Sequence, residues 1–107
     1  MRQLDPHELL AWRRGLAGDE PQYLDVRERW EFAHCRIEGS VNIPLGELTG
    51  RYEEIDGERP IVCICHHGIR SLQAAWFLEH AGCIDVVNLA GGIDAWSRQV
   101  DASIPTY

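Results

Sequence analysis

Residues 61–71 bring two cysteines, two histidines and one arginine together directly after Pro60, in the order IVCICHHGIRS. Thiols and imidazoles are side chains that bind zinc, and thiols also form disulfides or act as nucleophiles. The segment therefore raises three chemical possibilities: a metal site, a disulfide, or a reactive thiolate held in a loop.

The first two possibilities are disfavoured by spacing. Zinc needs four ligands that close a tetrahedron, and the candidates all fall within one short segment, at Cys63, Cys65, His66 and His67. Residues two apart on a strand lie about 6.6 Å apart at Cα, near the upper limit for a disulfide. We therefore expect no metal here, and we interpret Cys63 as a small apolar core residue.

The third possibility fits the residues that follow Cys65. Cys65 is predicted to end a buried strand and Arg70 to begin a helix, so backbone N–H groups of the short loop can converge near the helix N-terminus and bind an anion. A thiolate at Cys65 would be stabilised there, and its pKa is expected below the roughly 8.5 of a free thiol. Gly68 allows the tight curl, and Arg70 can either brace the loop or attract an anion. The alternative is an inert, packed Cys65.

Helices and strands alternate around this loop. Helical spacing of apolar residues predicts five helical segments: one from Asp5 or Pro6 to between Gly15 and Gly18, a brief turn at 29–33, 45–55 with a glycine interruption, about 70–80, and one opened by 91–92. Apolar and β-branched runs predict four strands, at 23–26, 41–43, 61–65 and 86–89. The spacing between strands is too long for hairpins, so we expect an α/β fold with a central, mainly parallel sheet and helices on both faces.

The helix predicted over residues 70–80 has the strongest pattern. Its apolar positions are Leu72, Ala75, Trp76 and Leu78, and Gly82 is its predicted stop. Ligands in such folds bind at the carboxyl ends of the strands, where the loop after Cys65 is predicted to lie.

Composition favours one soluble domain over residues 1–107, with 45% apolar and 25% charged residues. No apolar run approaches the roughly 20 residues that span a bilayer, and the N-terminus lacks the apolar core of a secretion signal. We therefore expect a cytoplasmic protein with no membrane partner and with its four cysteines reduced. A net charge of −7 without a cluster of Lys and Arg argues against a nucleic-acid partner.

Four segments in order resemble the rhodanese-like sulfurtransferases, specifically the single-domain bacterial kind. CHHGIRS at Cys65–Ser71 resembles the active-site loop of that family. The other three are LDVRE at Leu24–Glu28, GSVNIP at Gly39–Pro44 and NLAGGIDAW at Asn88–Trp96. Because they extend over nearly the whole chain, the resemblance implies a single rhodanese-like domain.

The resemblance implies a persulfide cycle. Catalytic Cys65 would take a sulfane sulfur from a small anionic donor such as thiosulfate and pass it to a thiol, to cyanide or to a protein acceptor, with no metal or organic cofactor. Asp25 and Arg27 are expected to support the strand edge and the loop by ionic hydrogen bonds. The remaining candidate residues, which would bind the donor, are His66, His67, Gly68, Ile69, Arg70 and Ser71.

Other functions remain open. Related phosphatases with this fold use a C-x5-R loop, whereas four residues separate Cys65 from Arg70 here, and the shorter loop favours sulfur transfer. A persulfide carrier, or a module that only binds a partner, has the same residues as a sulfurtransferase. The chain departs from the family at Cys35 and Arg36, where many members have Gly and His, so no role of that His is carried over. Cys35 is interpreted as a packed small residue, with a second redox thiol as the alternative.

Overall fold

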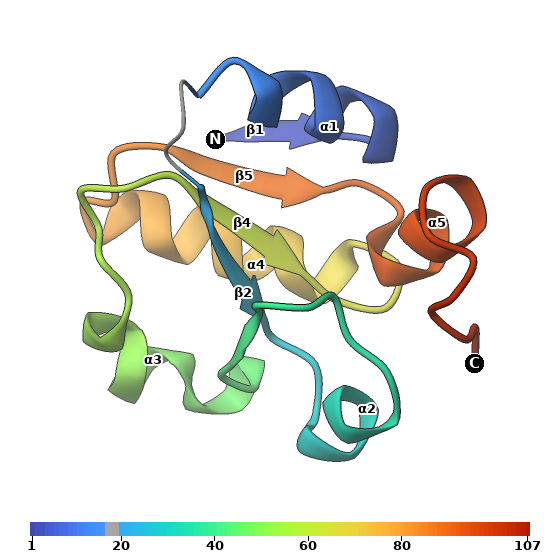
Figure 1. Ribbon diagram of the computed structural model, residues 1–107. Helices are drawn as coiled ribbons and strands as arrows, with labels where there is room; N and C mark the ends of the chain where they lie inside the picture. Colours follow the sequence, from blue (N-terminus) through green and yellow to red (C-terminus); the bar gives the residue numbers. More distant parts are fainter. Residues whose placement is uncertain (17–19) are drawn as a thin grey trace.

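The computed structural model describes residues 1–16 and 20–107 of the chain (Figure 1). Its centre is a sheet of strands in the order β1-β5-β4-β2-β3, and every neighbouring pair is parallel. The strands are β1 (Arg2–Leu4), β2 (Gln22–Asp25), β3 (Val41–Asn42), β4 (Ile61–Ile64) and β5 (Val86–Leu89). The predicted α/β fold with a parallel sheet is confirmed, and β4 lies in the middle of the sheet.

Helices cover both faces of the sheet, as Figure 1 shows. They are α1 (Pro6–Arg14), α2 (Arg29–His34), α3 (Leu48–Arg51), α4 (Ile69–His80) and α5 (Gly92–Gln99). Side chains alternate along β4: Ile61 and Cys63 pack in the cluster that includes residues of α3 and α4, whereas Val62 and Ile64 pack with residues of α1 and α5. Both faces of β4 are therefore buried, which explains its continuous apolar sequence.

The start of α1 follows from its first residues. The Asp5 side chain accepts a hydrogen bond from the Glu8 backbone, the Glu8 side chain accepts one from the Asp5 backbone, and Pro6 occupies the first helical turn. The helix ends at Arg14, with Gly15 as its cap. The predicted end as late as Gly18 lies outside the described residues.

Strand β1 is absent from the sequence-based prediction. Its three residues include exposed Arg2 and Gln3, so they show neither an apolar run nor β-branched side chains. The strand forms at the sheet edge, where it pairs with β5 and aligns Gln3 with Asn88.

The helix predicted over 45–55 is broken into three short pieces. Leu45–Glu47 and Tyr52–Glu54 are 3₁₀ turns, and only α3 between them is α-helical. Gly46 and Gly50 lower the helix propensity of a segment too short to form a stable helix by itself. The sequence pattern therefore predicts the location of the helical residues but not their continuity.

The sequence pattern places Trp76 among the apolar positions of α4 that pack in the core. This is wrong, because the residue is 51% exposed. The buried apolar residues of α4 are Ala74, Ala75 and Leu78, whose small or branched side chains fit closely against the sheet.

Within residues 1–16 and 20–107, no helix is both long enough and apolar enough to cross a membrane.

Candidate active site

Cys65 lies between β4 and α4, at the carboxyl end of the central strand. The strand ends at Ile64, one residue earlier than predicted, and the Cys65 side chain belongs to the buried core cluster beside α4. Gly68 caps α4 with φ 96°, a left-handed conformation that favours glycine. The chain thus turns from strand to helix within a few residues, with Cys65, at 1% exposure, beneath the turn.

Two hydrogen-bonding groups face the Cys65 sulfur. The backbone N–H of Gly68 donates to Sγ at 3.0 Å, and the hydroxyl oxygen of Ser71 lies 3.2 Å from it. Both groups belong to the start of α4, where the helix dipole is positive. The arrangement can stabilise negative charge on the sulfur.

The loop is held from its other side by the start of α5. The backbone N–H of Ile93 donates to the carbonyl of Cys65 at 2.8 Å, and that of Asp94 donates to the carbonyl of His66 at 3.1 Å. Gly92 has φ 64°, and a Cβ at this position would lie 2.5 Å from the Cys65 carbonyl oxygen. A glycine is therefore required where α5 approaches the loop.

Arg70 braces the loop against α2. Its guanidinium donates two hydrogen bonds to the carboxylate of Glu31, at 2.7 and 2.9 Å. The Arg70 hydrogen bonds lower the pKa of Glu31 to about 2, and Glu31 in turn raises the pKa of Arg70. Of the two roles considered for Arg70, the structure shows the bracing one. Glu31 was not among the predicted site residues.

Asp25 and Arg27 form a fully buried ion pair at the end of β2, next to β4. Arg27 donates to the Asp25 carboxylate at 2.7 Å and to the Cys35 carbonyl at 2.6 Å. Burial alone would lower the pKa of Arg27, but hydrogen bonds from its guanidinium to Asp25 and Tyr107 outweigh it and raise the pKa. The pair holds the end of β2 to the segment that follows α2, by the ionic hydrogen bonds that the residue types suggest.

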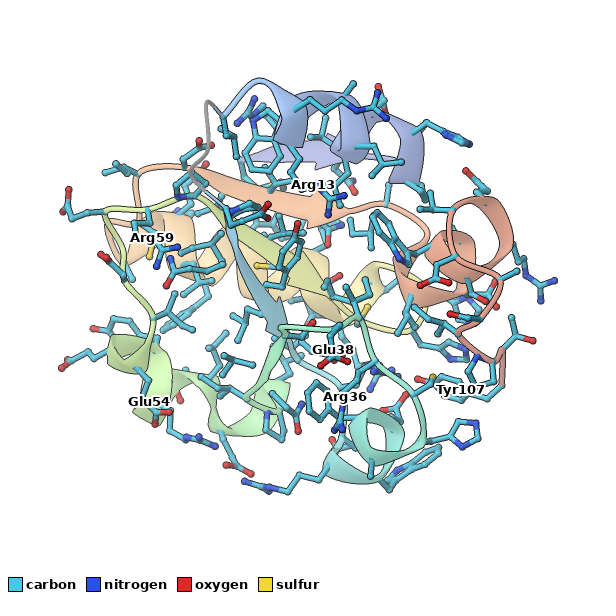
Figure 2. All side chains as sticks on the ribbon, in the orientation of Figure 1. Arg13, Arg36, Glu38, Glu54, Arg59 and Tyr107 are labelled. Carbon is cyan, nitrogen blue, oxygen red and sulfur yellow. The ribbon has the colours of Figure 1, made fainter. Side chains whose placement is uncertain are left out.

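The His66 ring stacks on both Tyr107 and His67. The His66 ring lies 3.9 Å from the Tyr107 ring at an interplanar angle of 4°, and 3.9 Å from the His67 ring. Burial and the neighbouring His67 lower the pKa of His66. The Tyr107 hydroxyl donates to Glu31 at 2.7 Å and accepts from Arg27 at 2.9 Å. Figure 2 shows Tyr107 at the C-terminal end, beside α2; no local motif had indicated it.

The positions that depart from the family pattern lie at the end of α2. Cys35 is buried, and its sulfur lies 3.8 Å from an Arg27 nitrogen. Arg36 is exposed, with its guanidinium 4.9 Å from the centre of the Phe32 ring. The burial of Cys35 is consistent with a packed small residue.

The candidate residues therefore gather around one loop. Ile69 is 71% exposed at its rim, and His67 is exposed as well. In the part of the chain that the structure describes, no group of three His, Cys, Asp or Glu side chains is arranged to hold a metal ion. The chemistry available is that of a buried sulfur facing hydrogen-bond donors at a helix start.

Comparison with known proteins gives consistent matches. Residues 8–99 match the family described as the rhodanese-like domain. The chain is 37% identical over 75 residues to thiosulfate sulfurtransferase GlpE of Shewanella oneidensis, a match that covers 70% of this chain and 74% of that protein. It is 36% identical over 94 residues to the putative sulfur carrier protein YrkF of Bacillus subtilis, covering 87% of this chain but only 51% of that protein.

The fold has a similar counterpart among solved structures. The crystal structure of a rhodanese-related protein from Thermoplasma volcanium has a TM-score of 0.80 and 30% sequence identity to this chain, and the match covers 94% of each. The similarity extends over the sheet and the helices together.

Proposed function

The chain belongs to the rhodanese-like domain family, and we propose from this that it is a sulfurtransferase. It moves sulfane sulfur from thiosulfate, or a similar small anionic donor, to a thiophilic acceptor through a persulfide on Cys65. The observation that carries the proposal is the Cys65 sulfur, placed at the start of α4 with the Gly68 N–H directed at it at 3.0 Å. The likeness to GlpE supports the choice of thiosulfate as donor.

In the proposed first step, the Cys65 thiolate attacks the outer sulfur of thiosulfate. A sulfur–sulfur bond forms at Cys65 as the bond within thiosulfate breaks, and the electron pair of that bond leaves on sulfite. The negative charge of the thiolate thereby moves to the terminal sulfur of the persulfide. In the second step a thiol, cyanide or a protein cysteine attacks that terminal sulfur, and the Cys65 thiolate returns.

The loop residues have distinct proposed roles. Backbone N–H groups of 66–71 bind the charged donor and the terminal persulfide sulfur, since the first N–H groups of a helix have no partner within it. Ser71 faces the Cys65 sulfur directly, and Arg70 holds the loop in shape through Glu31. His66, His67 and Ile69 form the rim that the donor contacts, while Asp25 and Arg27 support the neighbouring strand end.

A persulfide carrier is the second candidate, favoured by the likeness to YrkF. Such a protein would accept sulfur on Cys65 once and hand it to a specific partner, with little turnover on small acceptors. For either function we propose the cytoplasm as the compartment, because a catalytic thiolate requires surroundings that keep thiols reduced.

The direct test is the mass of the intact protein after incubation with thiosulfate. The wild type is expected to gain one sulfur atom, and Cys65→Ser none. Cys83→Ser is the matched control: Cys83 is a partly exposed free thiol outside the loop, and its removal should leave the gain unchanged. Repeated thiocyanate formation with cyanide identifies an enzyme, whereas a single stoichiometric transfer identifies a carrier. No gain with thiosulfate, mercaptopyruvate or a persulfide donor would overturn both functions.

A further inference from the structure

The hydroxyl group of Ser71 has two neighbours and one proton to donate. Its oxygen lies 2.5 Å from Oδ1 of Asn88 and 3.2 Å from Sγ of Cys65. Ser71 and Asn88 have no exposed surface and Cys65 is 1% exposed, so no water molecule replaces a missing partner easily. How the hydroxyl proton is shared therefore depends on the protonation state of Cys65.

The orientation of the Asn88 amide is determined by its other contacts. Nδ2 donates to the carbonyl oxygen of Gly68 at 3.1 Å and to Oε1 of Gln3, on β1, at 2.8 Å. A backbone carbonyl can only accept, so the NH₂ group of Asn88 must face Gly68. The Oδ1 atom then faces Ser71, and it needs a donor.

The hydrogen bonds are complete when Cys65 is a thiol. The S–H group donates to the Ser71 oxygen, and the Ser71 hydroxyl donates to Asn88. When Cys65 is a thiolate, the single proton of Ser71 can go either to the sulfur or to Oδ1 of Asn88. The sulfur also accepts from the Gly68 N–H, whereas Oδ1 depends on Ser71. Leaving a buried acceptor without a donor is costly.

We propose that Asn88 is a positioning residue that competes with Cys65 for the Ser71 hydroxyl proton and so disfavours the resting thiolate relative to the persulfide. The persulfide part of this role rests on the proposed function. When the Cys65 sulfur bonds to the transferred sulfur, its charge moves to the terminal atom and the electron pair of the broken bond leaves on sulfite. The Cys65 sulfur then no longer needs the Ser71 proton, which returns to Asn88.

Other ionisable groups surround the sulfur and act on it in every variant alike. Arg70 on α4 is paired with Glu31 on α2, and burial raises the pKa of Cys63 on β4. His66 and His67 lie in the loop, and Asp94 of α5 donates its backbone N–H to the His66 carbonyl. None of these contacts uses the Ser71 hydroxyl, so comparing variants isolates the effect of Asn88.

The test measures the rate of alkylation of Cys65 by iodoacetamide against pH, with fragment mass spectrometry to separate Cys65 from Cys63. Asn88→Leu removes the acceptor and frees the Ser71 proton for the thiolate. The midpoint of its pH profile is expected to fall by about one pH unit below that of the wild type. Asn88→Ala removes the same acceptor with less bulk, which keeps the prediction testable if leucine does not fit.

A double variant separates this role from a merely structural one. In a Ser71→Ala background no hydroxyl proton is shared, so adding Asn88→Leu should leave the midpoint unchanged. The lost contact between Asn88 and Gly68 is common to both backgrounds and cannot create a difference between them. An unchanged or raised midpoint in both Asn88→Leu and Asn88→Ala, or an equal shift in the Ser71→Ala background, would overturn the proposal. Alkylation needs no sulfur donor, so its outcome is independent of whether thiosulfate is a substrate.

Discussion

At the scale of single residues, Glu31 connects the parts of the site that the chain places far apart. Its buried carboxylate accepts hydrogen bonds from Arg70, from the Tyr107 hydroxyl and from the backbone N–H of Glu28. Together they keep it ionised at any physiological pH, since its pKa is lowered to about 2, chiefly by Arg70. The loop, α2 and the C-terminal segment are thereby joined at one side chain.

Stability in acid is expected to depend on Glu31. Because its folded pKa of about 2 lies below the ordinary 4.5, its contribution is complete above pH 4.5 and is lost as the pH falls from there toward 2. With the discount for solvent screening at the partly exposed Arg70, the full contribution is about 1–3 kcal/mol in the free energy of unfolding. Urea titrations at pH 7, 4 and 3 should show Glu31→Gln less stable than the wild type at pH 7, with the gap narrowing in acid.

The exposed Glu53→Gln is the control for that experiment, since it should follow the wild type at each pH. A gap between Glu31→Gln and the wild type that stays constant from pH 7 to pH 3 would contradict the assignment of the acid dependence to Glu31.

The sequence predicts the residues of the site where a short local segment contains them, as with Asp25 and Arg27 at one strand end. Cys65, Gly68, Arg70 and Ser71 form one short segment, and a strand followed by a helix is enough to bring them together. Glu31 lies 39 residues from Arg70 along the chain and Tyr107 lies 76 from Glu31, so their contacts depend on the completed fold. No local pattern encodes such contacts.

At the scale of elements, the site is the loop after β4, held by hydrogen bonds at the starts of α4 and α5. The start of α4 presents the Gly68 N–H to the sulfur, and the start of α5 binds the carbonyl groups of Cys65 and His66. With their carbonyl oxygens turned toward α5, these two peptide groups have a fixed orientation. The shape of the loop therefore depends on how closely α5 can approach.

Replacing Gly92 is expected to disturb the loop more than replacing another glycine of similar conformation. Gly92→Ala introduces a Cβ against the Cys65 and His66 carbonyl groups, which should destabilise the fold by about 1–3 kcal/mol beyond the conformational cost and slow the sulfur loading of Cys65. Gly82→Ala is the matched control, because Gly82 also has positive φ but has open space around its Cβ position. Thermal unfolding and the rate of mass gain measure the two effects; equal losses in the two variants would refute the close-approach argument.

The elements themselves are predictable to different degrees. The buried strands and α4 have long apolar patterns and are predicted within a residue or so. The sequence does not predict β1, because this strand depends on pairing with β5. It predicts where the helical residues of 45–55 lie but not their division into three pieces, which depend on packing against the core. The contact between Gln3 and Asn88 thus follows from an edge strand that only the complete sheet stabilises.

At the scale of the whole molecule, cations near the site are paired while the chain remains strongly acidic. Arg70 is paired with Glu31 and Arg27 with Asp25, whereas the net charge is −7. In the proposed reaction, a donor that approaches Cys65 therefore meets backbone dipoles at short range. At long range it meets the repulsion of an acidic protein.

The pairing of Arg70 with Glu31 determines how the reaction rate of Cys65 should depend on salt concentration. The Debye length falls from about 30 Å at 0.01 M salt to about 8 Å at 0.15 M, so added sodium chloride should screen the repulsion between the protein and a dianionic donor and raise kcat/KM for thiosulfate. Alkylation supplies a matched pair of probes: the rate with anionic iodoacetate should rise with salt, and that with neutral iodoacetamide should not. If thiosulfate and iodoacetate both react more slowly at higher salt, an unpaired cation attracts them instead. An anionic donor is thus expected to reach Cys65 faster as counterions accumulate around the acidic protein.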